Sequence, residues 1–320
     1  MTHTPKVVVI GGGTGLPVLL RGLKRHPIDI SAIVTVADDG GSSGRLRDSL
    51  DIPPPGDIRN VLAALSEVEP LVEQMFQHRF ETTNELSGHA LGNLIIAALA
   101  SITGDFVHAI QEMSRVLNVK GKVLPSANQS VILKAEMEDG TIVTGESAIP
   151  KAGKKIKRVF LKPDSIKALG ETLRAIKEAD LIVMGPGSLY TSILPNLLVP
   201  GIGEAVCRAD AKKMYICNIM TQAGETLDYS ASDHVKALYD HLETPSIDYI
   251  LVNKKQVPKE VQVRYNEEQA SPVHFDVDKL RSMGLEVIAE EILSYDNHFV
   301  RHNTEKVADI IYSYLKESTT

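Results

Sequence analysis

The sequence predicts an α/β fold: a doubly wound, mostly parallel Rossmann-like sheet with a small antiparallel β insertion. Three observations support this. The β-branched run Lys6–Ile10 leads through a glycine-rich turn into an apolar helix, as expected of a strand buried on both faces. Similar apolar runs recur between helical segments, and parallel neighbours require such crossover helices. An Asp-Gly turn between two alternating segments marks a hairpin.

The first half of the chain supplies the opening βαβ unit. After Lys6–Ile10, the apolar positions from Val18 to Leu23 predict a helix, and Ile30–Val36 predicts a second strand. Three consecutive prolines beginning at Pro53 then break the chain. Further helices are expected over Ile58–Glu67 and Ala90–Ile102.

The hairpin signal lies near the middle of the chain. Val131–Glu136 and Thr141–Thr144 flank Asp139-Gly140, a dipeptide suited to a tight hairpin turn. With Val159–Leu161 they predict a small antiparallel insertion over residues 128–162.

The α/β alternation then resumes. Strands are expected at Asp180–Met184, Lys213–Met220, Asp248–Val252 and Leu285–Ile288, with a closing helix over Glu305–Leu315. We therefore interpret residues 1–320 as a single nucleotide-binding domain that contains the insertion. In such a sheet the ligand is expected at the carboxyl ends of the strands.

Composition limits the classes of function. The chain has 34 Lys and Arg against 41 Asp and Glu, a net charge of −7, which argues against a dedicated nucleic-acid binder. Two cysteines exclude a disulfide scaffold and fit a reducing compartment. We find no apolar run of the roughly 18–20 residues that a membrane span needs, and no signal peptide. We expect a cytoplasmic protein, and its apolar helix faces permit a homodimer.

The turn Gly11-Gly-Gly-Thr-Gly-Leu16 is the first candidate ligand site. Glycine lets backbone N–H groups approach an anion at a helix N-terminus, which favours a phosphate or sugar-nucleotide cradle over a turn without a ligand. The turn is not a Walker A loop, because no Gly-Lys-Ser/Thr follows it. The dinucleotide fingerprint would require a third glycine at Leu16. The candidate residues are Gly11, Gly12, Gly13, Thr14, Gly15 and Leu16.

Asp38 and Asp39 end the second strand, where a dinucleotide enzyme places its ribose-binding acid. Two carboxylates beside a phosphate loop could equally hold Mg²⁺, or a single aspartate could cap a helix. The following Gly40-Gly-Ser-Ser-Gly44 predicts a second anion-binding loop. Its candidate residues are Gly40, Ser42 and Ser43.

Polar residues also mark two predicted helix starts. Asp57 is expected to cap its helix, and Arg59 in the first turn opposes the helix dipole unless it faces an acid or an anion. Asn60 belongs to the same run. Asn93 begins an otherwise apolar helix, either as a buried amide or as a ligand contact.

Gly185-Pro-Gly-Ser188 is the second glycine turn at a strand end. Ser188 is expected to cap a helix whose N-terminus points at the cleft, and the next strand ends in further polar side chains. In the last third of the chain, a loop tyrosine could stack on a base and a loop arginine could bind a phosphate. These candidates are Gly185, Gly187, Ser188, Tyr190, Asn218, Thr221, Tyr265 and Arg301.

Together these motifs resemble the bacterial gluconeogenesis-factor (YvcK-like) family over nearly the whole chain. The segments that carry the resemblance are Ile10–Leu16, Ala37–Arg45, Pro53–Asn60, Gly88–Asn93, Gly185–Tyr190 and Cys217–Gln222. The wider superfamily includes the Mg²⁺-dependent 2-phospho-L-lactate transferase of deazaflavin coenzyme biosynthesis. The segment from Asp248 onward differs from that transferase, so acceptor binding is not carried over.

The resemblance implies a Rossmann-like cytoplasmic protein that binds UDP-sugars such as UDP-N-acetylglucosamine. It also implies a role in cell shape and envelope synthesis during gluconeogenic growth. Relatives in Gram-positive bacteria resemble substrates of Ser/Thr kinases, which makes Thr304, expected to cap the last helix, a candidate phosphoacceptor.

Three hypotheses stay open at this stage. The first is a nucleotide-sugar-binding regulator without turnover, with the pyrophosphate on the two glycine turns and the sugar or ribose near Asp38 and Asp39. The second is a phosphoryl transferase that holds Mg²⁺ through Asp38 and Asp39. The third is an NAD-dependent oxidoreductase.

Overall fold

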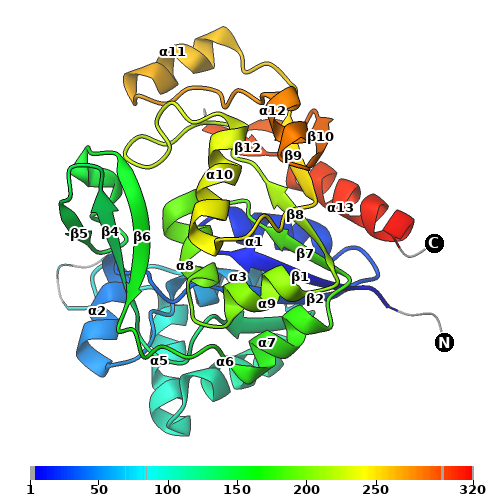
Figure 1. The fold of residues 1–320 in the computed structure, drawn as a ribbon. Coiled ribbons are helices and arrows are strands. Elements are labelled where there is room, and N and C mark those ends of the chain that lie inside the picture. The colour runs from blue at the N-terminus through cyan, green and yellow to red at the C-terminus, as the bar shows by residue number, and fades with distance from the viewer. Residues whose placement is uncertain (1–3, 69, 82, 84, 297–298, 319–320) are drawn as a thin grey trace.

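The computed structural model describes residues 4–68, 70–81, 83, 85–296 and 299–318. Its centre is a seven-stranded parallel sheet with the order β10-β9-β8-β7-β1-β2-β3 (Figure 1). Chain order therefore runs outward in both directions from β1. The strands are β1 (Lys6–Gly11), β2 (Asp29–Val34), β3 (Lys122–Pro125), β7 (Leu181–Met184), β8 (Lys212–Ile216), β9 (Tyr249–Asn253) and β10 (Glu286–Glu290).

The predicted fold class is confirmed. Strand β3 is the one strand of the central sheet that the sequence did not predict. Its four residues pair with β2 from Ser31↔Lys122 to Val34↔Pro125. The segment is short and ends in proline, so it carries little strand periodicity of its own. Pro125 is tolerated because β3 is an edge strand.

Helices cover both faces of the sheet, and β1 shows why. Val7 and Val9 belong to one hydrophobic cluster, and Val8 and Ile10 to the other, because successive side chains point to opposite faces. One face carries α1 (Gly15–Leu23), α3 (Gly56–Leu65), α5 (Leu91–Thr103), α6 (Phe106–Val116) and α13 (Thr304–Ser318); the other carries α7 (Gly170–Lys177), α8 (Leu194–Leu197), α9 (Ile202–Arg208) and α10 (Ala231–Leu242).

The remaining helical elements are shorter or peripheral. They are α2 (Gly41–Leu50), α4 (Pro70–Gln77), α11 (Lys259–Glu267), α12 (Val277–Ser282), a 3₁₀ turn η1 (Pro150–Ala152) and a π-type turn η2 (Leu189–Ile193). None of the helices in the described part of the chain has the length and hydrophobicity needed to cross a membrane.

The predicted insertion forms a three-stranded antiparallel sheet with the order β5-β4-β6, at the left of Figure 1. Its strands are β4 (Ile132–Met137), β5 (Ile142–Thr144) and β6 (Ile156–Lys162). Alternate residues of β4 (Leu133, Ala135 and Met137) are buried in the cluster shared with one face of the central sheet.

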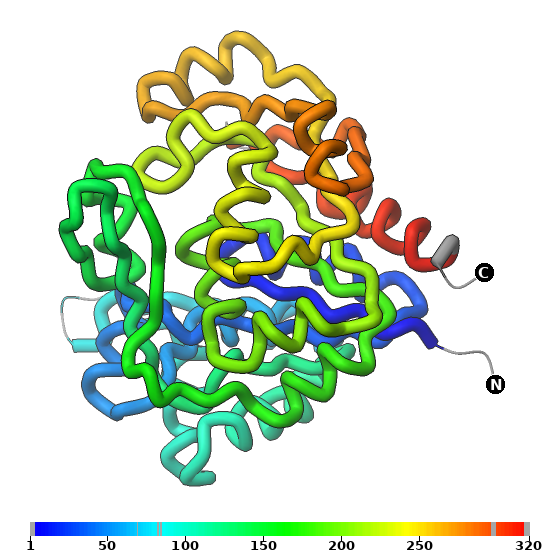
Figure 2. The backbone as a smooth tube through the Cα atoms, in the orientation of Figure 1, coloured from blue at the N-terminus to red at the C-terminus, as the bar shows by residue number. Residues whose placement is uncertain are grey.

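Two late segments differ from the loops that we expect from the sequence. Arg264 and Tyr265 lie in α11, and Arg301 lies in the hairpin of β11 (Leu293–Asp296) and β12 (Phe299–His302). The segment KEVQVRYNE lacks the apolar periodicity that would predict a helix, and Val261 is the one residue of α11 that is buried. In the backbone tube of Figure 2, α11 is the yellow-orange helix at the top of the view.

The N-terminal helix α1 packs closely against the C-terminal helix α13. The contact depends on Gly22, where an added methyl carbon would lie 2.8 Å from the Thr304 carbonyl oxygen and 3.0 Å from the Ala308 Cβ. The crossing therefore fixes the start of α13 relative to the helix that follows the first glycine turn.

Gly22→Ala is expected to lower the free energy of unfolding by about 1–2 kcal/mol, because overpacking outweighs the better helix propensity of alanine. Gly170→Ala is the control, since Gly170 also lies in a helix but has no neighbouring atom within 4 Å of an added Cβ. Denaturant unfolding of both variants checks the prediction. Equal stability of Gly22→Ala and the wild type would show that the crossing is not tight.

Candidate functional site

Two glycine turns meet where the direction of strand order reverses. The turn after β1 leads into α1, and the turn after the neighbouring strand β7 leads into η2. A Cβ on Gly15 would lie 2.8 Å from the Pro186 carbonyl oxygen, and one on Gly187 would lie 3.3 Å from the Ser192 Cβ. Ligands of doubly wound sheets bind in the crevice at this topological switch point.

The first turn is held by a carboxylate from α3. Gly13 has φ +63°, a left-handed conformation that favours glycine, and its N–H donates to Asp57 Oδ2 at 2.8 Å. Asp57 lies inside the first turn of α3, whose N-cap is Pro55, so the prediction that Asp57 caps this helix is wrong. Its carboxylate instead orients the glycine turn.

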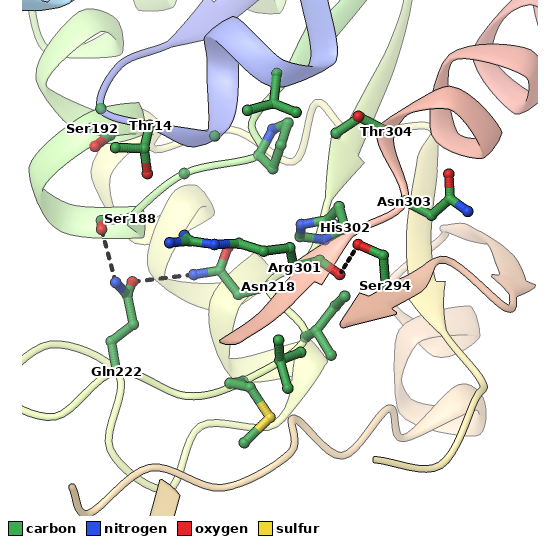
Figure 3. Close-up of a pocket in the computed structure, with 18 of the residues that line it drawn as sticks. Thr14, Ser188, Ser192, Asn218, Gln222, Ser294, Arg301, His302, Asn303 and Thr304 are labelled. Atoms are coloured by element: carbon green, nitrogen blue, oxygen red, sulfur yellow. Dashed lines mark hydrogen bonds between the residues drawn. The ribbon is translucent and has the colours of Figure 1, made fainter. Parts of the chain in front are cut away.

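The second turn is connected to the end of β8 by side-chain hydrogen bonds. Gln222 Nε2 donates to Ser188 Oγ at 2.9 Å, and Asn218 Nδ2 donates to Gln222 Oε1 at 3.2 Å (Figure 3). The Ser188 hydroxyl therefore accepts from Gln222 rather than capping the following turn as we expect from the sequence. Three polar side chains from two loops form one edge of the site.

The opposite wall comes from α11 and the β11–β12 hairpin. Tyr265 Oη accepts a hydrogen bond from the Val300 N–H at 2.9 Å, which joins the two elements. Two guanidinium groups approach the Phe299 ring, with Arg264 Cζ at 4.7 Å and Arg301 Cζ at 5.6 Å from its centroid. Such contacts are cation–π interactions, and they bring Arg301 to the mouth of the site.

These walls enclose a cavity of about 760 Å³. Figure 3 shows the Arg301 side chain reaching across it from β12 towards Asn218, with Thr14 on the side of the glycine turn. The candidate residues that line the cavity are Gly12, Gly13, Thr14, Gly15, Gly187, Ser188, Asn218, Thr221, Tyr265, Arg301 and Thr304. The structure therefore brings together side chains and backbone groups from both ends of the sequence.

A second set of candidates gathers at the starts of α2, α3 and α5, outside the lining of this cavity. Gly40 precedes α2 and Ser42 and Ser43 lie in its first turn, so the expected second anion loop is the start of a helix. Asn93 Nδ2 donates to Ser42 Oγ at 3.0 Å. The set comprises Asp38, Gly40, Ser42, Ser43, Asp57, Arg59, Asn60 and Asn93.

Arg59 is the most buried charged member of this set, with a relative exposure of 6%. Its Nη2 donates to Asn60 Oδ1 at 2.7 Å, while Nε and Nη1 have no partner in the described structure. Burial lowers the pKa of its guanidinium to about 10. Asn93 Oδ1 is likewise buried and unpaired.

Four further candidates lie in the interior behind the turns. Leu16 is fully buried in the core, and Tyr190 is 2% exposed with its hydroxyl 2.8 Å from the Tyr229 hydroxyl. Their side chains do not line the cavity. Gly11 ends β1 and Gly185 follows β7, so both act in the backbone geometry of the turns.

The carboxylates near the switch point repel one another. Burial, followed by the charges of Asp38, Asp57 and Asp39, raises the pKa of Glu146 to about 8. Burial also raises the pKa of Glu225 to about 7 and that of Asp57 to about 6. The acids are therefore less ionised at neutral pH than surface carboxylates.

The carboxylates of Asp38 and Asp39 accept hydrogen bonds from different segments of the chain. Asp38 Oδ1 accepts from Gly40 N at 2.8 Å, whereas Asp39 Oδ1 accepts from Ser147 N, in the insertion, at 2.9 Å. Among the described residues, no three His, Cys, Asp or Glu side chains are grouped as a metal ion would require. Because Mg²⁺ usually binds through one or two carboxylates together with substrate phosphates, Asp38 and Asp39 stay candidate ligands under the transferase hypothesis only, and we derive no step through a metal.

Thr304 is the first residue of α13, and Asn303 provides the cap. Asn303 Oδ1 accepts from Lys306 N at 3.1 Å, so the expectation that Thr304 is the cap is wrong by one residue. Thr304 nevertheless lies at a helix N-terminus and lines the cavity.

Sequence reasoning missed several cavity residues. Gln222 stands inside one of the motifs, and Ser192 follows the second glycine turn, so a closer study of the motifs could have found both. Ser294, Val300, His302 and Asn303 come from the hairpin region, whose position depends on tertiary contacts.

The fold and the cavity define a Rossmann-like α/β protein with a ligand site between two glycine turns. The chain matches the family model described as 2-phospho-L-lactate transferase CofD over residues 7–293. It is 65% identical to a gluconeogenesis factor of Bacillus subtilis (strain 168) over 317 residues, covering 99% of this chain and all of that protein. The chain belongs to the CofD family, among its gluconeogenesis-factor relatives.

Two further relatives agree with this assignment. A gluconeogenesis factor of Halalkalibacterium halodurans is 63% identical over 305 residues, or 95% of each chain. A crystal structure of a Bacillus halodurans protein superposes with a TM-score of 0.95 at 62% identity, covering 97% of this chain and all of that one.

The raised pKa values predict that stability falls as pH rises. Glu146 is protonated in the folded protein up to pH about 8 but ionises near its ordinary pKa of 4.5 when unfolded. Between these two pH values the folded state holds a proton on Glu146 that the unfolded state has lost. The free energy of unfolding therefore falls as pH rises through this window. Glu146→Gln is expected to flatten the profile and gain about 1–3 kcal/mol at pH 8.

Denaturant unfolding from pH 5 to pH 8 measures this effect. Glu138→Gln is the control, because this exposed residue lies in the same insertion and away from the buried carboxylates. If the stability of Glu146→Gln falls with pH as steeply as that of the wild type, the assignment to Glu146 is wrong.

Proposed function

We propose that the chain is a nucleotide-sugar-binding regulator, with UDP-N-acetylglucosamine as the type of ligand, and that it acts without turnover. Its proposed role is in cell shape and envelope synthesis during growth on gluconeogenic carbon sources. The observation that carries the proposal is the cavity at the switch point, lined by two glycine turns and faced by Arg301. The name of the relatives, gluconeogenesis factor, supports the link to growth on gluconeogenic carbon sources.

The polarity of the walls suits a nucleotide diphosphate. The turn at Gly12–Gly15 ends in the N-terminus of α1, where backbone N–H groups and the helix dipole favour an anion. Arg301 offers a guanidinium that can bind phosphate oxygens with two parallel hydrogen bonds. Tyr265 lies on the same wall and could pack against a base.

The cavity also changes where the sugar is placed. Asp38 and Asp39 lie outside its lining, so we no longer place the ribose or sugar beside them. The polar chain of Ser188, Gln222 and Asn218 instead offers hydroxyl and amide groups inside the cavity. Sugar hydroxyls can both donate to and accept from such groups.

A second candidate function is Mg²⁺-dependent phosphoryl transfer of the 2-phospho-L-lactate transferase type. The observation that favours it is the family match over residues 7–293. It would draw on the carboxylates of Asp38 and Asp39, whose hydrogen bonds lead to different segments. NAD-dependent oxidation is a weaker candidate, because the buried Leu16 stands where the third glycine of the fingerprint belongs.

A thermal-shift panel separates these functions. UDP-N-acetylglucosamine, GDP and NAD would each be added with and without Mg²⁺, because a ligand that binds the native state raises its melting temperature. We expect a selective rise with UDP-N-acetylglucosamine that is independent of Mg²⁺ and gives no nucleotide product. A Mg²⁺-dependent rise with GDP would instead support the transferase.

Arg301→Ala is expected to weaken UDP-N-acetylglucosamine binding by about 10- to 100-fold, the loss of a charged hydrogen-bond pair. Arg264→Ala is the matched control, since Arg264 also packs on Phe299 but does not line the cavity. Calorimetric titration of both variants checks this. If Arg264→Ala and Arg301→Ala weaken binding equally, Arg301 acts by stabilising the hairpin and not by contacting the phosphate.

Candidate partners follow from the same proposal. Phosphorylation of Thr304 by a Ser/Thr kinase would place a phosphate at the start of α13, where the helix dipole is favourable. Envelope-synthesis proteins are the proposed readers of the bound state. A homodimer is compatible with this role.

A further inference from the structure

The imidazole of His302 lies in the cavity wall, at the end of β12 and beside the end of β8 (Figure 3). Its Nε2 is 3.1 Å from the carbonyl oxygen of Cys217. A carbonyl oxygen can only accept, so Nε2 must carry the hydrogen and donate it. This contact fixes which of the two ring nitrogens is protonated.

The other ring nitrogen of His302, Nδ1, has no hydrogen-bond partner among the described residues. Nδ1 does not belong to the side-chain atoms that are both buried and unpaired, so it keeps some exposed surface. His302 itself lines the cavity. Burial lowers the pKa of the imidazole to about 4, so the ring is neutral at physiological pH. A neutral ring with its hydrogen on Nε2 presents a bare lone pair at Nδ1.

His234 shows what a purely structural histidine looks like in this fold. One of its ring nitrogens lies 2.8 Å from the Ser230 carbonyl oxygen, and its other nitrogen is buried without a partner. The side chain has no exposed surface. His302 makes the same kind of backbone contact, but its second nitrogen is open to the cavity.

The acceptor at His302 contrasts with the rest of the proposed phosphate-binding region. The glycine turns and Arg301 offer donors and positive charge, which attract phosphate oxygens. A bare ring nitrogen repels phosphate oxygens, because two acceptors cannot share a hydrogen that neither carries. It attracts a hydroxyl or an N–H group instead.

We propose that His302 is a specificity-determining residue of the cavity, whose Nδ1 accepts a hydrogen bond from a hydroxyl or N–H of the nucleoside or sugar part of the ligand. The inference rests on the proposed function and adds to it the orientation of the ligand in the cavity. The pyrophosphate lies towards the glycine turns, and a neutral hydrogen-bond donor lies at His302. A ligand that consists of phosphate alone gains nothing from this residue.

Three variants separate the two nitrogens. His302→Gln keeps a donor for the Cys217 carbonyl but removes the acceptor at Nδ1. His302→Asn keeps an amide oxygen near the Nδ1 position and gives up the contact with Cys217. His234→Gln is the control for replacing a buried histidine outside the cavity.

Calorimetric titration with UDP-N-acetylglucosamine is the first measurement. We expect His302→Gln to bind about 3- to 10-fold more weakly than the wild type, the loss of one neutral hydrogen bond, and His302→Asn to lose less. Inorganic pyrophosphate, used as a competitor that has neither a nucleoside nor a sugar, should bind equally to the wild type and His302→Gln. Unchanged binding of the nucleotide sugar to His302→Gln, or an equal loss for pyrophosphate, would overturn the proposal.

Deoxygenated ligands then identify the donor. UDP-sugar analogues lacking single ribose or sugar hydroxyls, or carrying an N-methylated uracil, form a double-mutant cycle with His302→Gln. For one analogue the difference between wild type and variant should vanish. If every analogue retains the full difference, His302 contacts none of these donors and the assignment fails.

Nitrogen-15 spectra of the imidazole test the premise in the ligand-free protein. We expect a neutral ring protonated at Nε2 at pH 7; a ring protonated at Nδ1, or a charged ring, would overturn the inference. This measurement does not depend on the proposed function. The proposed function fails separately if the wild type binds no UDP-sugar.

Discussion

The site depends on the close approach of the two glycine turns that follow β1 and β7. These strands are neighbours in the sheet, so their ends lie side by side, and any side chain at Gly15 would meet the Pro186 carbonyl. The approach allows α1 and η2 to begin at the same place and leaves space above them for a cavity. Without it the hairpin and α11 would have no opposite wall.

The central part of this arrangement is predictable from the sequence. Both turns stand directly after apolar runs that predict buried strands, and the glycines themselves predict tight turns, so local patterns are enough to predict them. The insertion was predictable for the same reason, because Asp139-Gly140 fixes a tight turn between alternating segments. In each case the information lies within about ten residues of chain.

The remaining parts depend on contacts between distant segments. Arg301 and Tyr265 were identified by residue type, but the wall that they form requires the bond between Val300 N and Tyr265 Oη. The sequence likewise could not show that Asp57 would bind Gly13, 44 positions away, rather than cap its own helix. It also could not separate the candidates around Asn93 from those of the cavity, because both sets follow strands or begin helices.

The bond between Asp57 and Gly13 links these two sets. A ligand phosphate that approaches the first glycine turn finds the Gly13 N–H already engaged by a carboxylate, and the charge of the half-buried Asp57 opposes a second anion. Burial, which raises the pKa of Asp57 to about 6, reduces this opposition only in part at neutral pH. The glycine turn alone is therefore a weaker anion site than its motif suggests. A countercharge on the opposite wall is required, and Arg301, reaching across the cavity, is placed to supply it.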